Sequence, residues 1–273
     1  MREKLLTHNG SRIYYETEGE GLPVILIHGF GEDGTVWRYQ RAFLKDHFRL
    51  IIPDLPGSGK SELLSISPNN DSFIIDLYAA CIKQILDQEN IQKCTMLGHS
   101  MGGYIALAFA QHNSDRLNGV GLVHSTAFAD SAEKKNTRKK GIAFIQRYGA
   151  GEFLKQSIPN LFAEKFTREH PDQIEAFIAN AGNFTAPALV QYYEAMMERP
   201  DRTETLKKSI NPVLFIIGEE DKSVSLQDSL KQCYLPGNTQ INILPGVAHM
   251  GMWERKDQTN DTVMKFLNYV SDA

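Results

Sequence analysis

This chain of 273 residues has few cysteines and no large excess of either positive or negative charge. Cys81, Cys94 and Cys233 are far apart, and no His or Cys pair has zinc-ligand spacing, so we expect no disulfide framework and no metal site. A reducing cytoplasm is the simplest compartment for such a chain. Lys and Arg number 29 against 33 Asp and Glu, a net charge of −4. Without a basic excess, nucleic-acid binding is disfavoured.

Long hydrophobic runs are also lacking. No run approaches the ~20 apolar residues that a membrane span needs, and residues 1–8 contain no apolar segment of the signal-peptide kind. We therefore expect neither a membrane span nor a signal peptide. The remaining composition is globular, with 42% hydrophobic and 23% charged residues, so the chain can build a full core.

Short apolar runs are frequent, and most of them end at glycine, histidine or proline. They do not alternate polar with apolar residues, which is typical of parallel strands covered on both faces. Helical patterns at 71–88, 101–112 and 257–270 lie between or after them. The order predicts an open α/β sheet with helices on both faces. The expected strands are 11–16, 24–27, 48–52, 95–97, 120–123, 213–217 and 241–244.

One region breaks the alternation of strand and helix. Residues 126–209 contain helical patterns at 133–148, 171–181 and 186–199, and no convincing strand. We interpret this region as a helical cap over the site, inserted in a core formed by residues 1–125 and 210–273. Packing of the same helices elsewhere on the sheet is the alternative.

The most informative motif is Gly98-His99-Ser100-Met101-Gly102, between an apolar strand and an Ala-rich helix. This context suits a nucleophile on a sharp strand-to-helix turn, where glycines avoid collisions with the crowded backbone. The helix amino end also favours developing negative charge on Ser100. An ordinary tight connection between strand and helix is the alternative.

A serine needs a base, and the base needs an acid that orients it. His249 follows the last strand and is the predicted base, although His28 and His124 also lie at strand ends. Asp221 follows the strand before it and is the predicted acid. Its neighbours Glu219 and Glu220 are expected to form a solvated loop.

Two backbone N–H groups should hold the oxyanion. Met101 follows the nucleophile, and Phe30 lies in the glycine-containing loop after the first parallel strand, so these two are the predicted donors. Aromatic and methionine side chains favour an apolar acyl or alcohol group in the pocket. The predicted substrate-contacting side chains are His124, Phe128, Phe144, Tyr192, Met196 and Met250, with Phe30, Met101, Phe153 and Phe162 as further candidates.

Two other motifs have weaker interpretations. Gly59-Lys60-Ser61 is not a phosphate loop, because that motif requires glycine where this chain has Asp54. The basic cluster at 134–140 is interpreted as a solvated helix face. A patch for an anionic substrate or a membrane surface is the sharper alternative.

These motifs together resemble the α/β-hydrolase superfamily over nearly the whole chain. The resemblance rests on the segments 28–31, 54–61, 98–103, 199–201, 212–224 and 246–249 with Glu254. It implies a mostly parallel eight-stranded sheet with the cap after the sixth strand, and it is closest to capped esterases, lactonases and cofactor-free haloperoxidases. Serine at position 100 disfavours epoxide hydrolases and haloalkane dehalogenases, and His99 disfavours carbon–carbon bond hydrolases.

We therefore expect a serine hydrolase for a small carboxylic ester or lactone, with no metal or organic cofactor. A ligand sensor that keeps the triad but turns over slowly is the alternative from another class. An aminopeptidase or a perhydrolase of the same fold is a further alternative. The sequence leaves the physiological substrate and the oligomeric state open.

Overall fold

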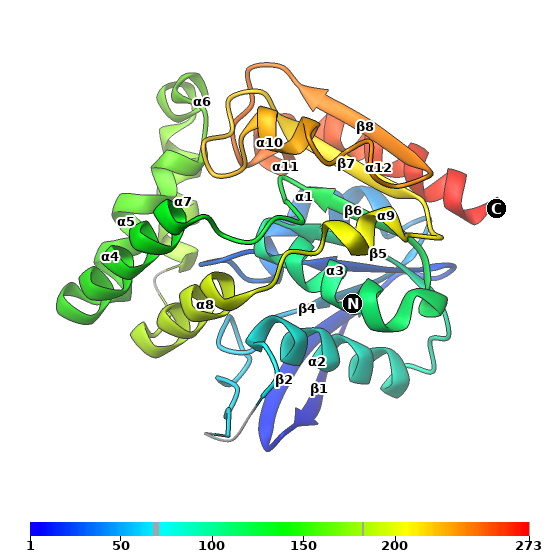
Figure 1. Ribbon diagram of the computed structural model, residues 1–273, viewed down its shortest axis with the longest axis horizontal. Helices are drawn as coiled ribbons and strands as arrows, with labels where there is room; N and C mark the ends of the chain where they lie inside the picture. The colour runs from blue at the N-terminus through cyan, green and yellow to red at the C-terminus, as the bar shows by residue number, and fades with distance from the viewer. Residues whose placement is uncertain (68–70, 182, 273) are drawn as a thin grey trace.

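A computed structural model describes residues 1–67, 71–181 and 183–272 (Figure 1). Its sheet has eight strands in the order β1-β2-β4-β3-β5-β6-β7-β8. β2 pairs antiparallel with β1 and β4, and the remaining pairs are parallel, which confirms the predicted architecture. The strands are β1 (Arg2–His8), β2 (Ser11–Glu18), β3 (Pro23–Ile27), β4 (Arg49–Pro53), β5 (Cys94–His99), β6 (Leu117–Val123), β7 (Val213–Gly218) and β8 (Thr239–Leu244).

Strand β1 was not among the strands expected from the apolar runs. It forms an edge of the sheet and pairs only with β2. Two of its seven residues are buried, so it needs no continuous apolar run. An edge strand of this kind gives a weak hydrophobic signal in sequence.

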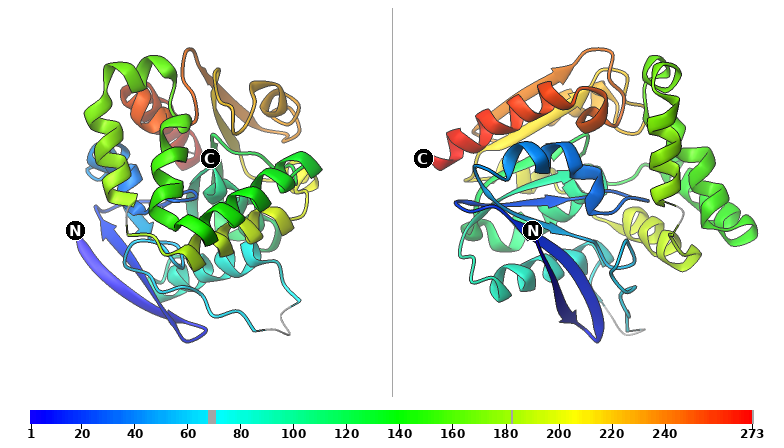
Figure 2. Two further views of the ribbon diagram at one scale, coloured as in Figure 1. Left: turned by 90° about the vertical axis from the view of Figure 1, so that its left-hand side faces the viewer. Right: turned by 180° about the vertical axis from the view of Figure 1, so that it is seen from behind.

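Helices cover both faces of the sheet, as Figure 2 shows. One face carries α2 (Ile74–Gln88) and α3 (Met101–Asn113), with α9 (Thr203–Lys207) against α3. The other carries α1 (Arg38–Leu44) and α12 (Lys256–Ser271), with the short α11 (Gly251–Glu254) between them. A further short helix, α10 (Leu226–Leu230), lies beside β7.

Side chains of the central strands contribute to two hydrophobic cores. Along β3, Ile25 and Ile27 enter the cluster shared with α2 and α3, whereas Val24 and Leu26 enter the cluster shared with α12. Successive side chains of a strand point to opposite faces, and here both faces are covered. This explains why the strand sequences are apolar throughout.

The segment between β6 and β7 is helical in its described residues. It forms α4 (Ala132–Tyr148), α5 (Ala150–Ser157), α6 (Glu164–Glu169), α7 (Pro171–Ala181) and α8 (Ala186–Glu198), which stand beside one end of the sheet in Figures 1 and 2. α8 contacts both α4 and α2. The predicted cap region 126–209 also contains α9, which packs on α3. The division into core and cap is a prediction.

Two of the expectations drawn from the sequence concern the cysteines and membrane-spanning helices. The three cysteines are free and buried. None of the helices in the described ranges has both the length and the apolar character required to cross a membrane.

Candidate active site

Ser100 occupies a strained turn between β5 and α3. Its φ of 50° and ψ of −115° lie outside the regions that non-glycine residues ordinarily adopt. A Cβ on Gly98 would lie 2.3 Å from the carbonyl carbon of Gly102, and one on Gly102 would lie 2.3 Å from Ile27 O. The Ser100 N–H donates to Val123 O at 3.0 Å, which ties the turn to β6. Both glycines are therefore required by close packing around the serine.

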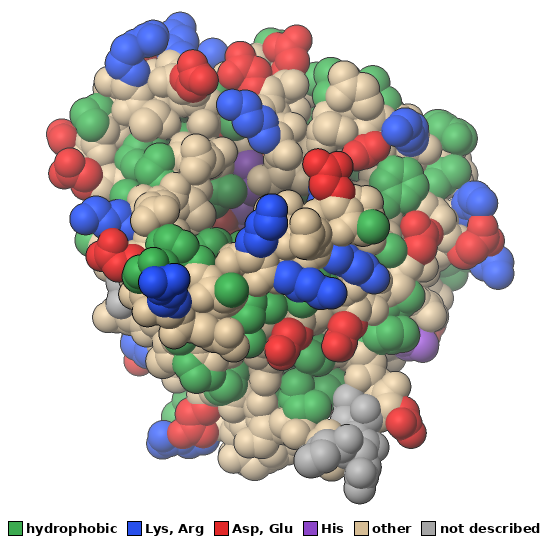
Figure 3. All heavy atoms as spheres, turned by 60° about the vertical axis from the view of Figure 1, so that its left-hand side comes forward, with side chains coloured by type: hydrophobic (Ala, Val, Ile, Leu, Met, Phe, Trp, Pro, Cys, Tyr) green, Lys and Arg blue, Asp and Glu red, His purple; other side chains and the backbone are tan. Residues whose placement is uncertain are grey.

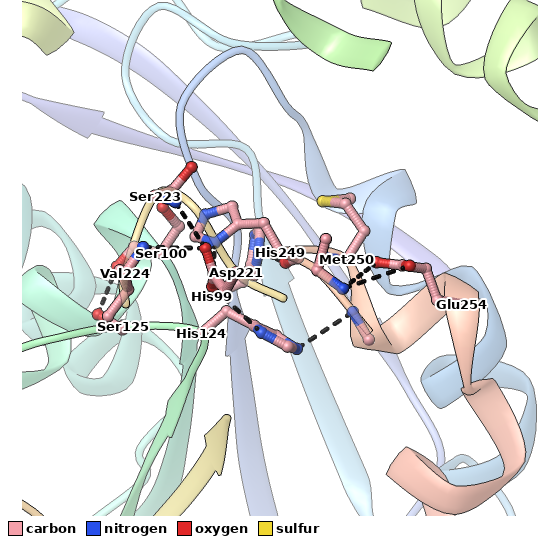
Figure 4. A network of polar contacts seen from close by, with 12 residues as sticks. His99, Ser100, His124, Ser125, Asp221, Ser223, Val224, His249, Met250 and Glu254 are labelled. Carbon is pink, nitrogen blue, oxygen red and sulfur yellow. Dashed lines mark hydrogen bonds and ion pairs between the residues drawn. The ribbon is translucent and has the colours of Figure 1, made fainter. Parts of the chain in front are cut away.

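His249 and Asp221 come together at the ends of β8 and β7. The distance from His249 Nδ1 to Asp221 Oδ2 is 2.7 Å (Figure 4). The other carboxylate oxygen accepts the N–H groups of Ser223 at 2.8 Å and Val224 at 2.9 Å. Burial would raise the pKa of Asp221, but the nearby His249 and His124 hold it well below its ordinary value. The carboxylate is thus ionised and oriented toward the imidazole.

Ser100 and His249 line the same cavity, which has a volume of about 140 Å³. Figure 3 shows the recess on this side of the molecule, with a histidine side chain visible inside it. No hydrogen bond joins Ser100 Oγ to His249 in the described chain. Such contacts often tighten only when substrate binds, and rotation of a serine side chain is easy. The structure brings all three predicted catalytic side chains to one end of the sheet.

The two predicted oxyanion donors flank Ser100. Phe30 lines the cavity, and Met101 is the first residue of α3. Among the described residues, neither backbone N–H donates to a protein acceptor. Free N–H groups at these two positions suit an oxyanion hole.

His124 was predicted to contact substrate, but it lies behind Asp221. It is buried, its Nε2 accepts the Gly251 N–H at 3.1 Å, and its Nδ1 stands 3.5 Å from Asp221 Oδ2. Burial lowers the pKa of His124 to about 4, so its ring is neutral near pH 7. His124, Asp221 and His249 have ligand atoms within 4.8 Å of one another, as a cation would need. The short bond between His249 and Asp221 already engages two of those atoms.

Of the other predicted substrate-contacting residues and further candidates, Met196 and Phe30 line the cavity, whereas Met101, Phe153 and Phe162 are not among its described lining residues. Tyr192 of α8 is fully buried and donates its hydroxyl to Leu55 O at 3.4 Å. Met250 is fully buried in the second core. Phe144 packs against neighbouring aromatic rings of the cap, and Phe128 is not a lining residue either. Helical spacing identifies an apolar face but not the surface against which that face packs.

Several lining residues were not predicted from sequence. The most informative are the charged residues Glu32 and Arg138 and the aromatic residues Tyr104 and Tyr193. The basic cluster at 134–140 contained the only signal for Arg138. The remaining unpredicted lining residues are Gly31, His99, Leu154, Ser157, Ile158, Leu161, Phe177, Ser223 and Val224.

A buried ion pair supports the loop that carries the oxyanion donor. Glu32 Oε2 accepts from Gly29 N at 2.7 Å and pairs with His99 Nδ1 at 2.9 Å, and His99 Nε2 lies 3.0 Å from His249 O. Burial would lower the pKa of His99 and raise that of Glu32. Their mutual attraction outweighs burial, so the pKa of His99 is raised and that of Glu32 is lowered. The pair links the oxyanion loop to the backbone of the predicted base.

The Glu32→Gln variant is expected to be less stable than wild type by about 3 kcal/mol near pH 5.5, because it leaves buried His99 without its counter-charge. A histidine whose pKa is raised in the folded state stabilises that state fully at pH values below its unfolded-state pKa of about 6.5. This stabilisation is lost as pH rises through the folded-state pKa. The difference between variant and wild type should therefore shrink in alkaline solution. Urea unfolding at both pH values measures it. A difference that grows with pH would contradict a charged pair.

Glu254 braces the loop on both sides of His249. Its carboxylate accepts the N–H groups of Ala248 at 3.1 Å and Met250 at 3.2 Å. It also accepts the N–H of Ala163 in the cap at 3.0 Å. Burial raises the pKa of Glu254, and these three bonds oppose the shift. Glu254 is therefore a positioning residue that joins the cap to the loop of the predicted base.

Comparisons with known proteins agree with this architecture. A family model described as the alpha/beta hydrolase fold matches residues 23–256. The 2-hydroxy-6-oxononadienedioate/2-hydroxy-6-oxononatrienedioate hydrolase of Paraburkholderia phymatum is 25% identical over 279 residues, covering 94% of this chain and 91% of that protein. A thermophilic esterase from Thermogutta terrifontis, solved with malate bound, superposes with a TM-score of 0.90 at 29% identity, covering 99% of both chains.

The enol-lactonase of Burkholderia xenovorans LB400 superposes with a TM-score of 0.87 at 22% identity, covering 97% of this chain and 100% of that chain. At that identity the likeness concerns the fold alone. The family model covers most of the chain, and the relatives named above are hydrolases. The chain therefore belongs to the α/β-hydrolase family.

Proposed function

We propose that this protein is a serine hydrolase that cleaves a small carboxylic ester or lactone through an acyl-enzyme on Ser100. One observation carries the proposal: Ser100 sits on a strained turn in the cavity that also contains His249, whose Nδ1 is 2.7 Å from buried Asp221. The esterase of Thermogutta terrifontis, at 29% identity, supports ester chemistry. Neither this reaction nor the roles below need a cofactor.

In the proposed reaction, His249 Nε2 takes the proton of Ser100 Oγ as that oxygen attacks the carbonyl carbon. The N–H groups of Phe30 and Met101 hold the oxyanion. His249 then gives the proton to the leaving alcohol. Water, deprotonated by the same imidazole, attacks the acyl-enzyme and releases the acid. Asp221 keeps Nε2 free of a proton at the start of each half-reaction.

Labelling with a fluorophosphonate tests this proposal. The wild-type protein should gain one covalent adduct, located on Ser100 by peptide mass spectrometry. Ser100→Ala should gain none. Ser157→Ala is the matched control, because Ser157 lines the same cavity without a base beside it and should leave the adduct in place. A folded wild-type protein that resists labelling would end the proposal.

The size of the cavity predicts short acyl or alcohol groups. An engineered cavity of about 150 Å³ accommodates benzene, so about 140 Å³ suits a group of similar size. We expect kcat/KM for p-nitrophenyl esters to fall at least about 10-fold from butyrate to decanoate, because longer chains must displace cap side chains such as Leu154 or Met196. Steady-state kinetics across the series measures this. A rising trend would contradict a small cavity.

Cleavage of a carbon–carbon bond is the second candidate, because the relative from Paraburkholderia phymatum is a dienedioate hydrolase. His99 paired with Glu32 precedes the serine in this chain, where those enzymes usually have asparagine or a similar residue. A ring-fission dienoate should therefore be a poor substrate.

The alternative that the protein is a ligand sensor is distinguished by turnover. A sensor would give one acylation burst and negligible later release.

A further inference from the structure

Two arginines share one carboxylate in the cap. Asp130 is completely buried and pairs with Arg138 Nε at 2.5 Å and with Arg199 Nη1 at 2.9 Å. Burial would raise the pKa of Asp130, but the two guanidinium groups lower it, so the carboxylate is ionised. Arginine is always charged in proteins. The three side chains together therefore hold one surplus positive charge.

Arg199 has no free donor group directed at the cavity. Its Nη2 donates to Phe128 O at 2.9 Å, its Nη1 also donates to Met196 O at 2.5 Å, and its guanidinium stacks 3.9 Å above the ring of Tyr104. It is 4% exposed and does not line the cavity. The surplus charge is therefore carried toward the cavity by Arg138.

Arg138 lines the cavity together with Ser100 and His249. Its Nε and Nη2 face Asp130, at 2.5 and 3.3 Å. Its Nη1 makes no hydrogen bond to another described residue, and the side chain is 19% exposed. The guanidinium lies 5.5 Å from the ring centroid of Tyr193. One edge of this guanidinium is thus held against Asp130, whereas Nη1 is left without a partner among the described residues.

The other charged groups around the cavity already have protein partners. Asp221, behind the cavity wall, accepts the N–H groups of Ser223 and Val224 and lies 2.7 Å from His249 Nδ1. Glu32 and His99 form an ion pair with each other. Apart from this pair, Arg138 and the predicted base His249, the described lining residues are neutral. A charged donor in a poorly solvated wall is costly unless a ligand group pairs with it. The charged donor at Arg138 Nη1, which has no partner among the described residues, is therefore complementary to one anionic group.

We propose that the substrate carries a carboxylate, which Arg138 binds through Nη1 while the ester carbonyl lies at Ser100. This inference rests on the proposed ester hydrolysis. A single surplus positive charge and a cavity of about 140 Å³ suit a small monoanion better than a phosphate dianion. This inference differs from the sequence-based expectation of a wholly apolar group in the pocket. It also assigns Arg138 to the cavity wall rather than to a solvated helix face. The carboxylate can belong to the acid or to the leaving alcohol.

The test compares esters that carry this charge with counterparts in which a methyl ester replaces the carboxylate. p-Nitrophenyl hydrogen glutarate places a carboxylate on the acyl side, and acetoxybenzoate places one on the leaving group; each is measured against its own methyl ester. In one of the two pairs, kcat/KM of wild type should be about 10- to 100-fold higher for the ester that carries the carboxylate than for its methyl ester. Arg138→Met should abolish the preference mainly by raising KM. Arg138→Lys should restore part of it.

Lys139→Met is the matched control, because it removes one positive charge from the neighbouring, exposed position of α4. It should keep the wild-type preference. Equal efficiency of wild type for both members of both pairs, or a preference that survives in Arg138→Met, would overturn the inference. The wild-type comparison needs no variant, so it stays decisive if Arg138→Met does not fold. Failure of wild type to hydrolyse any of these esters would instead overturn the proposed function, and this inference with it.

Discussion

Replacement of Ser100 by alanine is expected to lower kcat for a short p-nitrophenyl ester by about 10⁶-fold, on the scale of nucleophile deletion in other serine hydrolases. The expected loss is this large because, in the proposed mechanism, His249 and Asp221 act only through the serine oxygen. Binding and the oxyanion donors at Phe30 and Met101 should leave a rate above that of water. The measurement is steady-state hydrolysis with protein expressed apart from wild type, since trace contamination would dominate the signal.

The stability of Ser100→Ala should stay close to that of wild type. Alanine has the same Cβ and keeps the φ of 50°, so the strain in the turn is retained. Thermal unfolding of both proteins controls for misfolding. A folded alanine variant with more than about one-hundredth of wild-type kcat would require a different nucleophile, because no other triad member can replace the serine oxygen.

Asp221→Asn is expected to reduce kcat by about 10⁴-fold while the fold is kept. The amide oxygen can still accept the N–H groups of Ser223 and Val224, which now bond to Oδ1 at 2.8 and 2.9 Å. The amide NH₂ then faces His249 Nδ1 and donates to it. That tautomer of His249 carries its proton on Nε2, so it cannot accept the proton of Ser100.

The matched control is Glu220→Gln, one residue earlier on the same loop and exposed to solvent. It removes one carboxylate from the same region and should leave kcat within a factor of about 2 of wild type, as expected for an exposed surface change. Equal losses in both variants would assign the effect to loop charge rather than to the imidazole.

The pH dependence of Asp221 follows from the lowered pKa. A carboxyl whose folded pKa is depressed stabilises the protein above its unfolded value of about 3.9, and this stabilisation is lost as pH falls through the folded value. Asp221 therefore stays ionised across the range in which the enzyme is expected to work. The acidic limb of the wild-type kcat/KM profile should accordingly come from a group other than Asp221.

Much of the architecture, and the meeting of the three candidate catalytic side chains at one edge of the sheet, could be predicted because local sequence signals coincide with topology. Ser100, Asp221 and His249 each follow an apolar strand, and the carboxyl ends of parallel strands share one edge of the sheet. The strained turn is encoded within a few residues, since the glycines on both sides lie against backbone atoms. Edge strand β1 could not be found in this way, because it has one solvated face.

The walls of the cavity depend on packing that no local pattern encodes. Tyr192 is in the core and Tyr193 lines the cavity, just as Lys139 is exposed and Arg138 reaches the cavity. Consecutive residues of a helix point about 100° apart, so the role of each depends on how its helix is rotated against its neighbours. The chain alone determined the sheet, the turn at Ser100 and the order of its partners. Only the packing of the helices between β6 and β7, α4 and α8 among them, decided which of their side chains line the cavity, because that rotation results from contacts between segments far apart in sequence.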